Sequence, residues 1–136
     1  MVVASREAAK RHKLNVLGAL KTYSVAGVEP TIMGIGPAPA IRGAVKKAGV
    51  GIGDLEAVEV NEAFAPQVVS VERELKLDRE RLNPNGGGVS LGHPLGASGA
   101  RLALTLLYHM RRNNQKLGAA SLCIGGGQGI AAVFER

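Results

Sequence analysis

The sequence predicts an α/β domain in which a mixed sheet carries helices on both faces. Two observations predict it. Segments with the hydrophobicity of buried strands alternate with segments whose apolar residues recur at helical spacing. The last two strand-like segments are joined by only four residues, 125–128, which are too few for a crossover and therefore form an antiparallel hairpin. The length of 136 residues allows one domain with a sizeable core.

Five segments are predicted to be strands. The first is a long small and apolar run that we expect to be a central strand covered on both faces, and the second is short and ends just before Asn61. A third, very short one precedes His93. In chain order the five segments are residues 14–28, 55–60, 89–91, 117–124 and 129–134.

Three amphipathic stripes predict helices between these strands. The first covers residues 40–48 and is ended by Gly49. The second begins near Phe64, and the third runs from about Ala100 to Met110. Residues 1–13 are a basic segment or a short helix, 29–39 a loop rich in proline and glycine, and 76–85 a surface connection.

Composition limits the classes of partner. The net charge of +6 comes from scattered basic residues with few aromatics between them, so no nucleic-acid partner is expected, whereas an anionic small molecule fits better. The single cysteine, Cys123, excludes an internal disulfide and favours a reducing compartment. No apolar run approaches the ~20 residues of a membrane span. We therefore expect a soluble intracellular protein.

The run 83–101 holds His93 among six glycines and two prolines. Glycines let the main chain approach other groups closely, and Pro94 disfavours the helical region for the residue before it. His93 is therefore expected on a loop that opens onto the third helix.

Three residue types suited to acyl transfer follow predicted strands or a loop: Asn61, His93 and Cys123. Loops beyond the carboxyl ends of strands are where α/β proteins bind ligands. A thiol can be a nucleophile or base, imidazole moves protons near neutral pH, and amide donors can hold an oxyanion. Other interpretations stay open: a loop histidine bonded to a carbonyl, a small buried cysteine, and an asparagine that caps a helix. No spacing of His or Cys indicates a metal site.

Three motifs in this order closely resemble the thiolase family. They are Asn61-Glu62-Ala63-Phe64-Ala65, the run Gly-Gly-Gly-Val-Ser-Leu-Gly-His-Pro-Leu-Gly-Ala-Ser-Gly-Ala-Arg that contains His93, and Cys-Ile-Gly-Gly-Gly-Gln-Gly from Cys123. The resemblance covers the chain from about Leu14 and matches only the C-terminal half of a thiolase. It implies that residues 14–136 form a thiolase C-terminal domain, a βαβαβαββ half with a five-stranded mixed sheet between helices.

The resemblance also implies roles. His93 would activate a nucleophilic cysteine and contribute to an oxyanion hole, which a water held by Asn61 completes. Cys123 would be the acid and base for the acetyl-CoA carbon, and the Gly125 amide would help form a second oxyanion hole. Ala63 and Phe64 would border the pantetheine tunnel. Coenzyme A would be a substrate, and no cofactor would be covalently bound.

Thiolase chemistry needs two thiols, and this chain has one, which matches the second role. We therefore expect a catalytic half that works with an N-terminal thiolase half on acyl-CoA and CoA, is inactive alone and forms homo-oligomers, dimers or tetramers. The compartment stays open among cytoplasm, mitochondrial matrix and peroxisome. The alternative is a non-catalytic thiolase-like domain that binds acyl-CoA or serves assembly.

Overall fold

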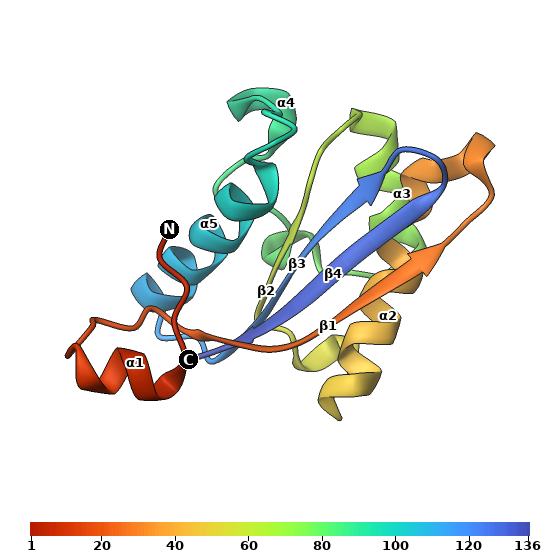
Figure 1. Cartoon of the computed structure of the whole chain (residues 1–136). Helices are drawn as coiled ribbons and strands as arrows, with labels where there is room; N and C mark the ends of the chain where they lie inside the picture. The colour runs from red at the N-terminus through yellow and green to blue at the C-terminus, as the bar shows by residue number, and fades with distance from the viewer.

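A computed structural model describes all 136 residues. The chain forms four strands, five α-helices and three short 3₁₀ segments (Figure 1). The strands are β1 (Ala19–Gly27), β2 (Ala57–Val60), β3 (Leu117–Ile124) and β4 (Gln128–Glu135). The α-helices are α1 (Arg6–Arg11), α2 (Pro37–Ala48), α3 (Ala65–Leu75), α4 (Gly88–Leu91) and α5 (Ser98–Arg112), and the 3₁₀ segments are η1 (Pro30–Ile35), η2 (Ile52–Asp54) and η3 (Arg79–Arg81).

The strands form one mixed sheet in the order β1-β4-β3-β2. β3 and β4 are the antiparallel hairpin that the short connection predicts, β1 pairs antiparallel with β4, and β2 runs parallel to β3. The expectation of a central first strand is wrong, because β1 lies at the edge. Its apolar side chains Leu20, Tyr23 and Val25 are 56%, 58% and 53% exposed, on the part of the α5 face of the sheet that α5 does not cover.

The fifth predicted strand is absent, because residues 89–91 lie in the short helix α4. The amide of Leu91 donates to the carbonyl of Gly87 at 2.9 Å and the amide of Gly92 to that of Gly88 at 2.9 Å, which closes a helical turn. The outer edge of β2 is instead met by a single parallel bridge between Val58 and Leu82. The side chain of Asn83 continues this pairing, since its Oδ1 accepts from the amide of Val60 at 2.8 Å and its Nδ2 donates to the carbonyl of Val60 at 2.9 Å.

Helices cover both faces of the sheet, as predicted, and divide the core in two (Figure 1). α2 and α3 lie on one face, where Ile41, Val68 and Val71 belong to the same apolar cluster as Val58 and Val60 of β2. α5 packs on the other face through Leu102, Leu106 and Met110, together with Ala57 and Ala120. Side chains of β2 therefore alternate between the two clusters, as the pleat of a strand requires.

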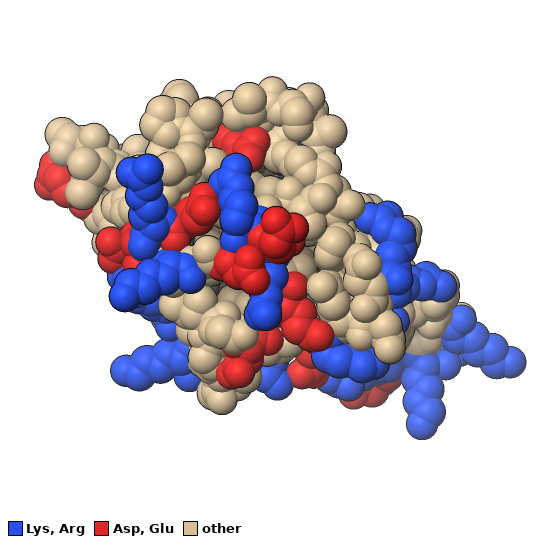
Figure 2. Space-filling model, turned by 180° about the vertical axis from the view of Figure 1, so that it is seen from behind, with Lys and Arg blue, Asp and Glu red and all other residues tan.

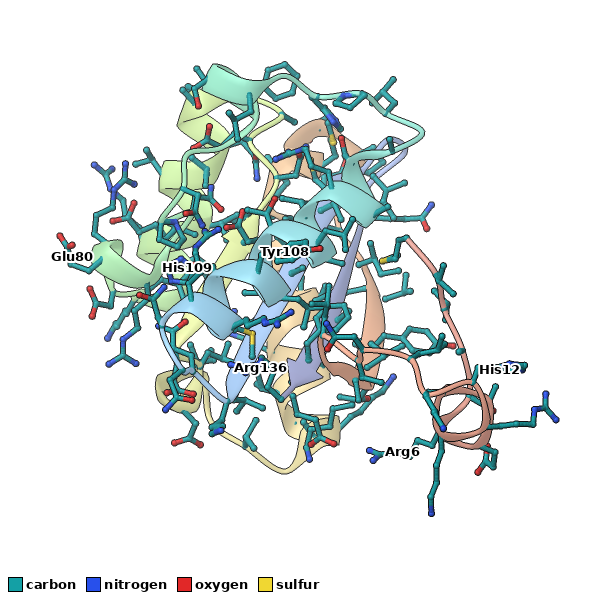
Figure 3. The ribbon with its side chains drawn as sticks, turned by 90° about the vertical axis from the view of Figure 1, so that its left-hand side faces the viewer. Arg6, His12, Glu80, Tyr108, His109 and Arg136 are labelled. Atoms are coloured by element: carbon teal, nitrogen blue, oxygen red, sulfur yellow. The ribbon has the colours of Figure 1, made fainter.

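The ends of the predicted helices follow local sequence rules. Gly49 takes a left-handed conformation, φ 71°, and ends α2 at the expected position. The helix α1 forms within residues 1–13 and buries no residue. Its Arg6 pairs with Glu135 at the end of β4 at 3.4 Å, whereas His12, which follows the helix, points away from the sheet (Figure 3). At the other terminus, Arg136 lies beneath the end of α5 and donates to the carbonyl of Met110 at 2.9 Å (Figure 3). No helix has the length and hydrophobicity needed to cross a membrane.

Candidate active site

Asn61 lies one residue beyond the carboxyl end of β2 and continues its pairing with β3. Its amide donates to the carbonyl of Ser121 at 2.9 Å, and its side chain is fully buried. Arg101 on α5 donates from a guanidinium NH2 to Oδ1 of Asn61 at 3.4 Å. The interpretation of Asn61 as a helix cap is wrong, because α3 starts after Phe64 and receives no side-chain cap.

His93 lies in the loop between α4 and α5 and is partly buried. Its Nδ1 lies 2.6 Å from the hydroxyl of Ser98, which itself donates to the carbonyl of Pro94 at 3.0 Å. A hydroxyl has one proton, and we assign that of Ser98 to its bond with the Pro94 carbonyl, so that the hydroxyl accepts from Nδ1 of the imidazole. This arrangement assigns the proton of a neutral His93 to Nδ1 and leaves Nε2 as the basic nitrogen.

The first turn of α5 connects these two residues. Ser98 and Arg101 are three positions apart and therefore lie next to each other on one helix face. One holds the imidazole of His93 and the other the amide of Asn61. The structure thus brings the loop histidine and the strand-end asparagine to the same helix terminus, as expected for residues beyond the strand ends.

Cys123 lies near the carboxyl end of β3, the strand next to β2, and pairs with Gly129 of β4. Its thiol is partly buried and makes no hydrogen bond to His93 or Asn61. Burial raises the pKa of the Cys123 thiol, so the neutral form is favoured at rest. Gly125 follows in the exposed hairpin turn, in which Gly126 and Gly127 have φ of 84° and 89°.

The surroundings of these strand ends are apolar and exposed. Phe64 precedes α3 and is 59% exposed, and Ala63 beside it is partly buried. Leu91 and Leu95 flank His93 with 56% and 83% exposure, and Ile124 follows Cys123. Seen from behind, charged side chains spread over the middle and lower parts of the molecule, whereas its top, to which α4 and the hairpin turn belong, shows mostly uncharged residues (Figure 2).

Two carboxylates that are not among the predicted site residues also belong to this region. Glu62 accepts from the amide of Val89 at 3.0 Å through Oε2 and from Nδ2 of Asn83 at 3.4 Å through Oε1, and so ties α4 to the end of β2. Glu59 is fully buried in the middle of β2. Burial raises the pKa of Glu59 to about 7, an effect that the nearby Arg101 opposes and Glu62 reinforces.

Signals for these unpredicted residues exist in the sequence. Glu59 is the one charged residue between Ala57 and Val60, and a charge in a short buried strand is rare without a purpose. Ser98 and Arg101 lie in the first turn of the helix that follows His93. The helix is predicted from its apolar residues alone, so that pattern does not single out these two polar side chains. No group of three or more His, Cys, Asp or Glu side chains in the structure could hold a metal ion.

Comparison with known proteins identifies the family of this chain. The family model described as "Thiolase, C-terminal domain" matches residues 14–136. The human mitochondrial 3-ketoacyl-CoA thiolase is 51% identical over 135 residues, which cover 99% of this chain and 34% of that protein. The acetyl-CoA acetyltransferase of Escherichia coli (strain K12) is 48% identical over 136 residues, covering 100% of this chain and 34% of the relative.

Solved structures give the same result. The crystal structure of human mitochondrial 3-ketoacyl-CoA thiolase in complex with CoA superposes with a TM-score of 0.94 at 52% identity, covering 97% of this chain and 34% of that one. The Bacillus anthracis acetyl-CoA acetyltransferase superposes with a TM-score of 0.93 at 51% identity, covering 96% of this chain and 33% of that one. The chain spans about a third of the length of these relatives. With both the family model and the thiolase fold matched along nearly its whole length, the chain belongs to the thiolase family and forms a thiolase C-terminal domain.

Proposed function

We propose that this chain is the catalytic C-terminal part of a thiolase and transfers acyl groups between CoA thioesters together with an N-terminal thiolase half. The complete reaction converts a 3-ketoacyl-CoA and CoA into acetyl-CoA and an acyl-CoA shortened by that acetyl unit, or runs in reverse. The observation that carries the proposal is the 2.6 Å contact between Nδ1 of His93 and Ser98, which leaves Nε2 free to accept a proton.

The nucleophilic thiol comes from the N-terminal half. His93 Nε2 takes its proton, and the thiolate attacks the 3-keto carbon. The backbone amide of Gly125 helps to stabilise the oxyanion that forms at carbon 3. Collapse of this intermediate breaks the bond between carbons 2 and 3, and the Cys123 thiol protonates carbon 2 to give acetyl-CoA. The Cys123 thiolate then takes the thiol proton of CoA, and the CoA thiolate attacks the acyl-enzyme thioester. This releases the shortened acyl-CoA, and the nucleophilic cysteine recovers its proton from His93.

The environment of Cys123 suits this role. Its raised pKa keeps the thiol protonated before the carbon–carbon bond breaks, which is the state that an acid needs. A water held by Asn61, together with His93, donates to the enolate oxygen of the departing acetyl-CoA. Ala63 and the exposed Phe64 provide apolar surface for the pantetheine arm of the substrate.

An uncovered apolar part of one face of the sheet, beside α5, supports an N-terminal partner half. Tyr23 and Val25 of β1 pair with Ala132 and Ile130 of β4, so these side chains share the face on which α5 lies. Beside α5 this face holds an apolar hollow of about 180 Å³, whose lining includes Leu122 and Phe134. An exposed apolar surface of this kind marks an interface. We propose that the N-terminal half covers it, and that the assembled protein forms dimers or tetramers.

The test is thiolysis of acetoacetyl-CoA by CoA. The chain is assayed alone and after co-expression with the N-terminal half of the human mitochondrial 3-ketoacyl-CoA thiolase, with assembly followed by sedimentation. We expect turnover only in the complex, and its loss in His93→Ala and Cys123→Ala. Turnover by the isolated chain would refute the dependence on a partner half.

The uncovered face also favours a second function, in which the chain serves only assembly or acyl-CoA binding. That function predicts a complex whose turnover is indifferent to His93→Ala and Cys123→Ala. The same assay therefore separates the two proposals.

A further inference from the structure

Three polar side chains lie between β2 and α5, inside a contact that is otherwise apolar. Glu59 and Asn61 are both 0% exposed, and they point toward α5 because side chains of β2 alternate and Ala57 already packs there. Arg101 enters from α5, next to the core residue Leu102, and donates to Oδ1 of Asn61 at 3.4 Å.

A contribution to the stability of the fold does not explain why Glu59 and Arg101 are buried here. Both carboxylate oxygens of Glu59 and the Nε and NH1 atoms of Arg101 are buried without a hydrogen-bond partner in this chain. Burying two opposite charges in a helix–sheet contact rarely stabilises a fold relative to apolar residues of similar size. Their retention beside Asn61 therefore calls for a role in the site.

The hydrogen bond between Arg101 and Asn61 can have only one direction, with Arg101 as the donor. A guanidinium carries donors and no acceptor, so it can bind the oxygen of the Asn61 amide and never its nitrogen. With Oδ1 occupied, Nδ2 is the end of the amide left for a ligand, and this atom is buried and unpaired in the chain. Without Arg101 the amide could rotate by half a turn and present its oxygen instead.

We propose that Arg101 is a positioning residue that fixes the Asn61 amide with Nδ2 toward the reacting thioester, with the nearby Glu59 carboxylate offsetting the charge of its guanidinium. The inference rests on the proposed function. A water that accepts from Nδ2 keeps both of its protons for the thioester oxygen, whereas a water bound to Oδ1 would spend one proton on the protein.

The same turn of α5 then sets both groups of the oxyanion site. Ser98 fixes the tautomer of His93, and Arg101, one turn later, fixes the amide of Asn61. Both act through another residue and neither needs to touch the substrate. A rigid helix is well suited to hold two donors at a constant separation.

The test is a double-mutant cycle in the complex of this chain with an N-terminal thiolase half. Thiolysis of acetoacetyl-CoA is measured for Arg101→Met, Asn61→Ala and the double variant, with Arg111→Met as the control because Arg111 is exposed on the same helix. We expect Arg101→Met to lower kcat about 10- to 100-fold, with KM within about twofold of the parent. The double variant should be no slower than Asn61→Ala, because Arg101 acts only through Asn61.

A second variant tests whether the loss of kcat in Arg101→Met is caused only by destabilisation of the fold. Arg101→Met leaves the buried Glu59 carboxylate unbalanced, so Glu59→Gln is combined with it to remove both charges. This pair should restore the thermal midpoint toward that of the parent while kcat stays as low as in Arg101→Met. Recovery of kcat along with the midpoint would show that Arg101 is only structural and overturn the proposal.

The remaining outcomes separate the two levels of inference. An inactive parent complex would refute the proposed function and the positioning role with it. An active parent that is impaired by Asn61→Ala but unaffected by Arg101→Met would overturn the positioning role alone. Losses of kcat that multiply in the double variant would also overturn it, since they would show that Arg101 acts independently of Asn61.

Discussion

The hydroxyl of Ser98 accepts a hydrogen bond from Nδ1 of His93 at 2.6 Å while donating its own proton to the carbonyl of Pro94. This pair of bonds fixes which imidazole nitrogen is basic. A residue five positions further along the chain, at the start of α5, thereby sets the chemistry of a loop histidine. The loop can stay rich in glycine because the helix, and not the loop itself, holds the imidazole.

Replacing Ser98 with alanine removes the acceptor of His93 Nδ1. Both tautomers of the imidazole then become accessible, and we expect kcat for thiolysis in the complex to fall about tenfold or more. Ser70→Ala is the matched control, because the Ser70 hydroxyl makes the same kind of bond to the carbonyl of Pro66, at 2.9 Å, on the exposed side of α3. Equal activities of the two variants would contradict the positioning role of Ser98.

Gly88 marks where α4 presses against the end of β2. A Cβ added there would lie 2.6 Å from the carbonyl oxygen of Glu62, a backbone atom that cannot move aside. We expect Gly88→Ala to lower the free energy of unfolding by about 1–3 kcal/mol, measured by urea unfolding of the chain. Gly53→Ala meets nothing within 4 Å and should be close to neutral. An equal loss in both variants would exclude a steric cause.

The elements that could be predicted from the sequence are those whose signal is local. Periodicity predicts the three long helices, the glycine at position 49 ends α2, and the short connection predicts the β3–β4 hairpin. The motif residues Asn61 and Cys123 lie at the ends of neighbouring strands, and the family resemblance is visible in the sequence because it depends only on such motifs and their order along the chain.

The errors come from contacts between distant residues. Residues 89–91 are apolar enough for a strand, but the carboxylate of Glu62, 27 positions earlier, accepts the amide of Val89 and favours the helical turn of α4. β1 is as hydrophobic as a central strand, but it lies at the edge of the sheet, and its apolar side chains beside α5 are not covered by any element of this chain. The role of Arg101 could not be predicted because its partner, Asn61, lies beyond the end of a strand 40 positions away.

The uncovered face of β1 gives a prediction about assembly. Val25 is 53% exposed and pairs with Ile130 in the apolar surface beside α5. A charge there would be desolvated without a partner, so Val25→Glu should weaken the complex with the N-terminal half at least about tenfold. Val2→Glu, the same substitution at a residue 84% exposed in the N-terminal segment, is the control. Isothermal titration or sedimentation measures the affinities, and unchanged binding by Val25→Glu would place the interface elsewhere.

Glu59 gives a prediction about pH. Burial raises the pKa of this carboxyl from 4.5 to about 7 in the folded chain. Between these values the folded state binds the proton more tightly than the unfolded state, so the contribution of Glu59 to stability is present below pH 4.5 and is lost as the pH rises through 7. The loss amounts to about 3 kcal/mol.

In Glu59→Gln the side chain at position 59 has no titratable group. The other titratable groups are the same in the variant and the parent, so their contributions to the pH dependence cancel in the difference between the two. The free energy of unfolding of Glu59→Gln minus that of the parent should therefore rise by about 3 kcal/mol across this pH range and level off above it. Urea unfolding of the chain at a series of pH values measures the difference.

Glu59→Met is the control variant, because it also lacks a titratable group at this position. Its difference curve must have the same slope as that of Glu59→Gln. The offset of the curve will differ, because the effect of Met on Arg101 and on packing does not depend on pH. A flat curve for both variants would mean that the carboxyl at position 59 ionises equally well in the folded and unfolded chain, and the charge balance proposed for Arg101 would then lack the buried setting on which it depends.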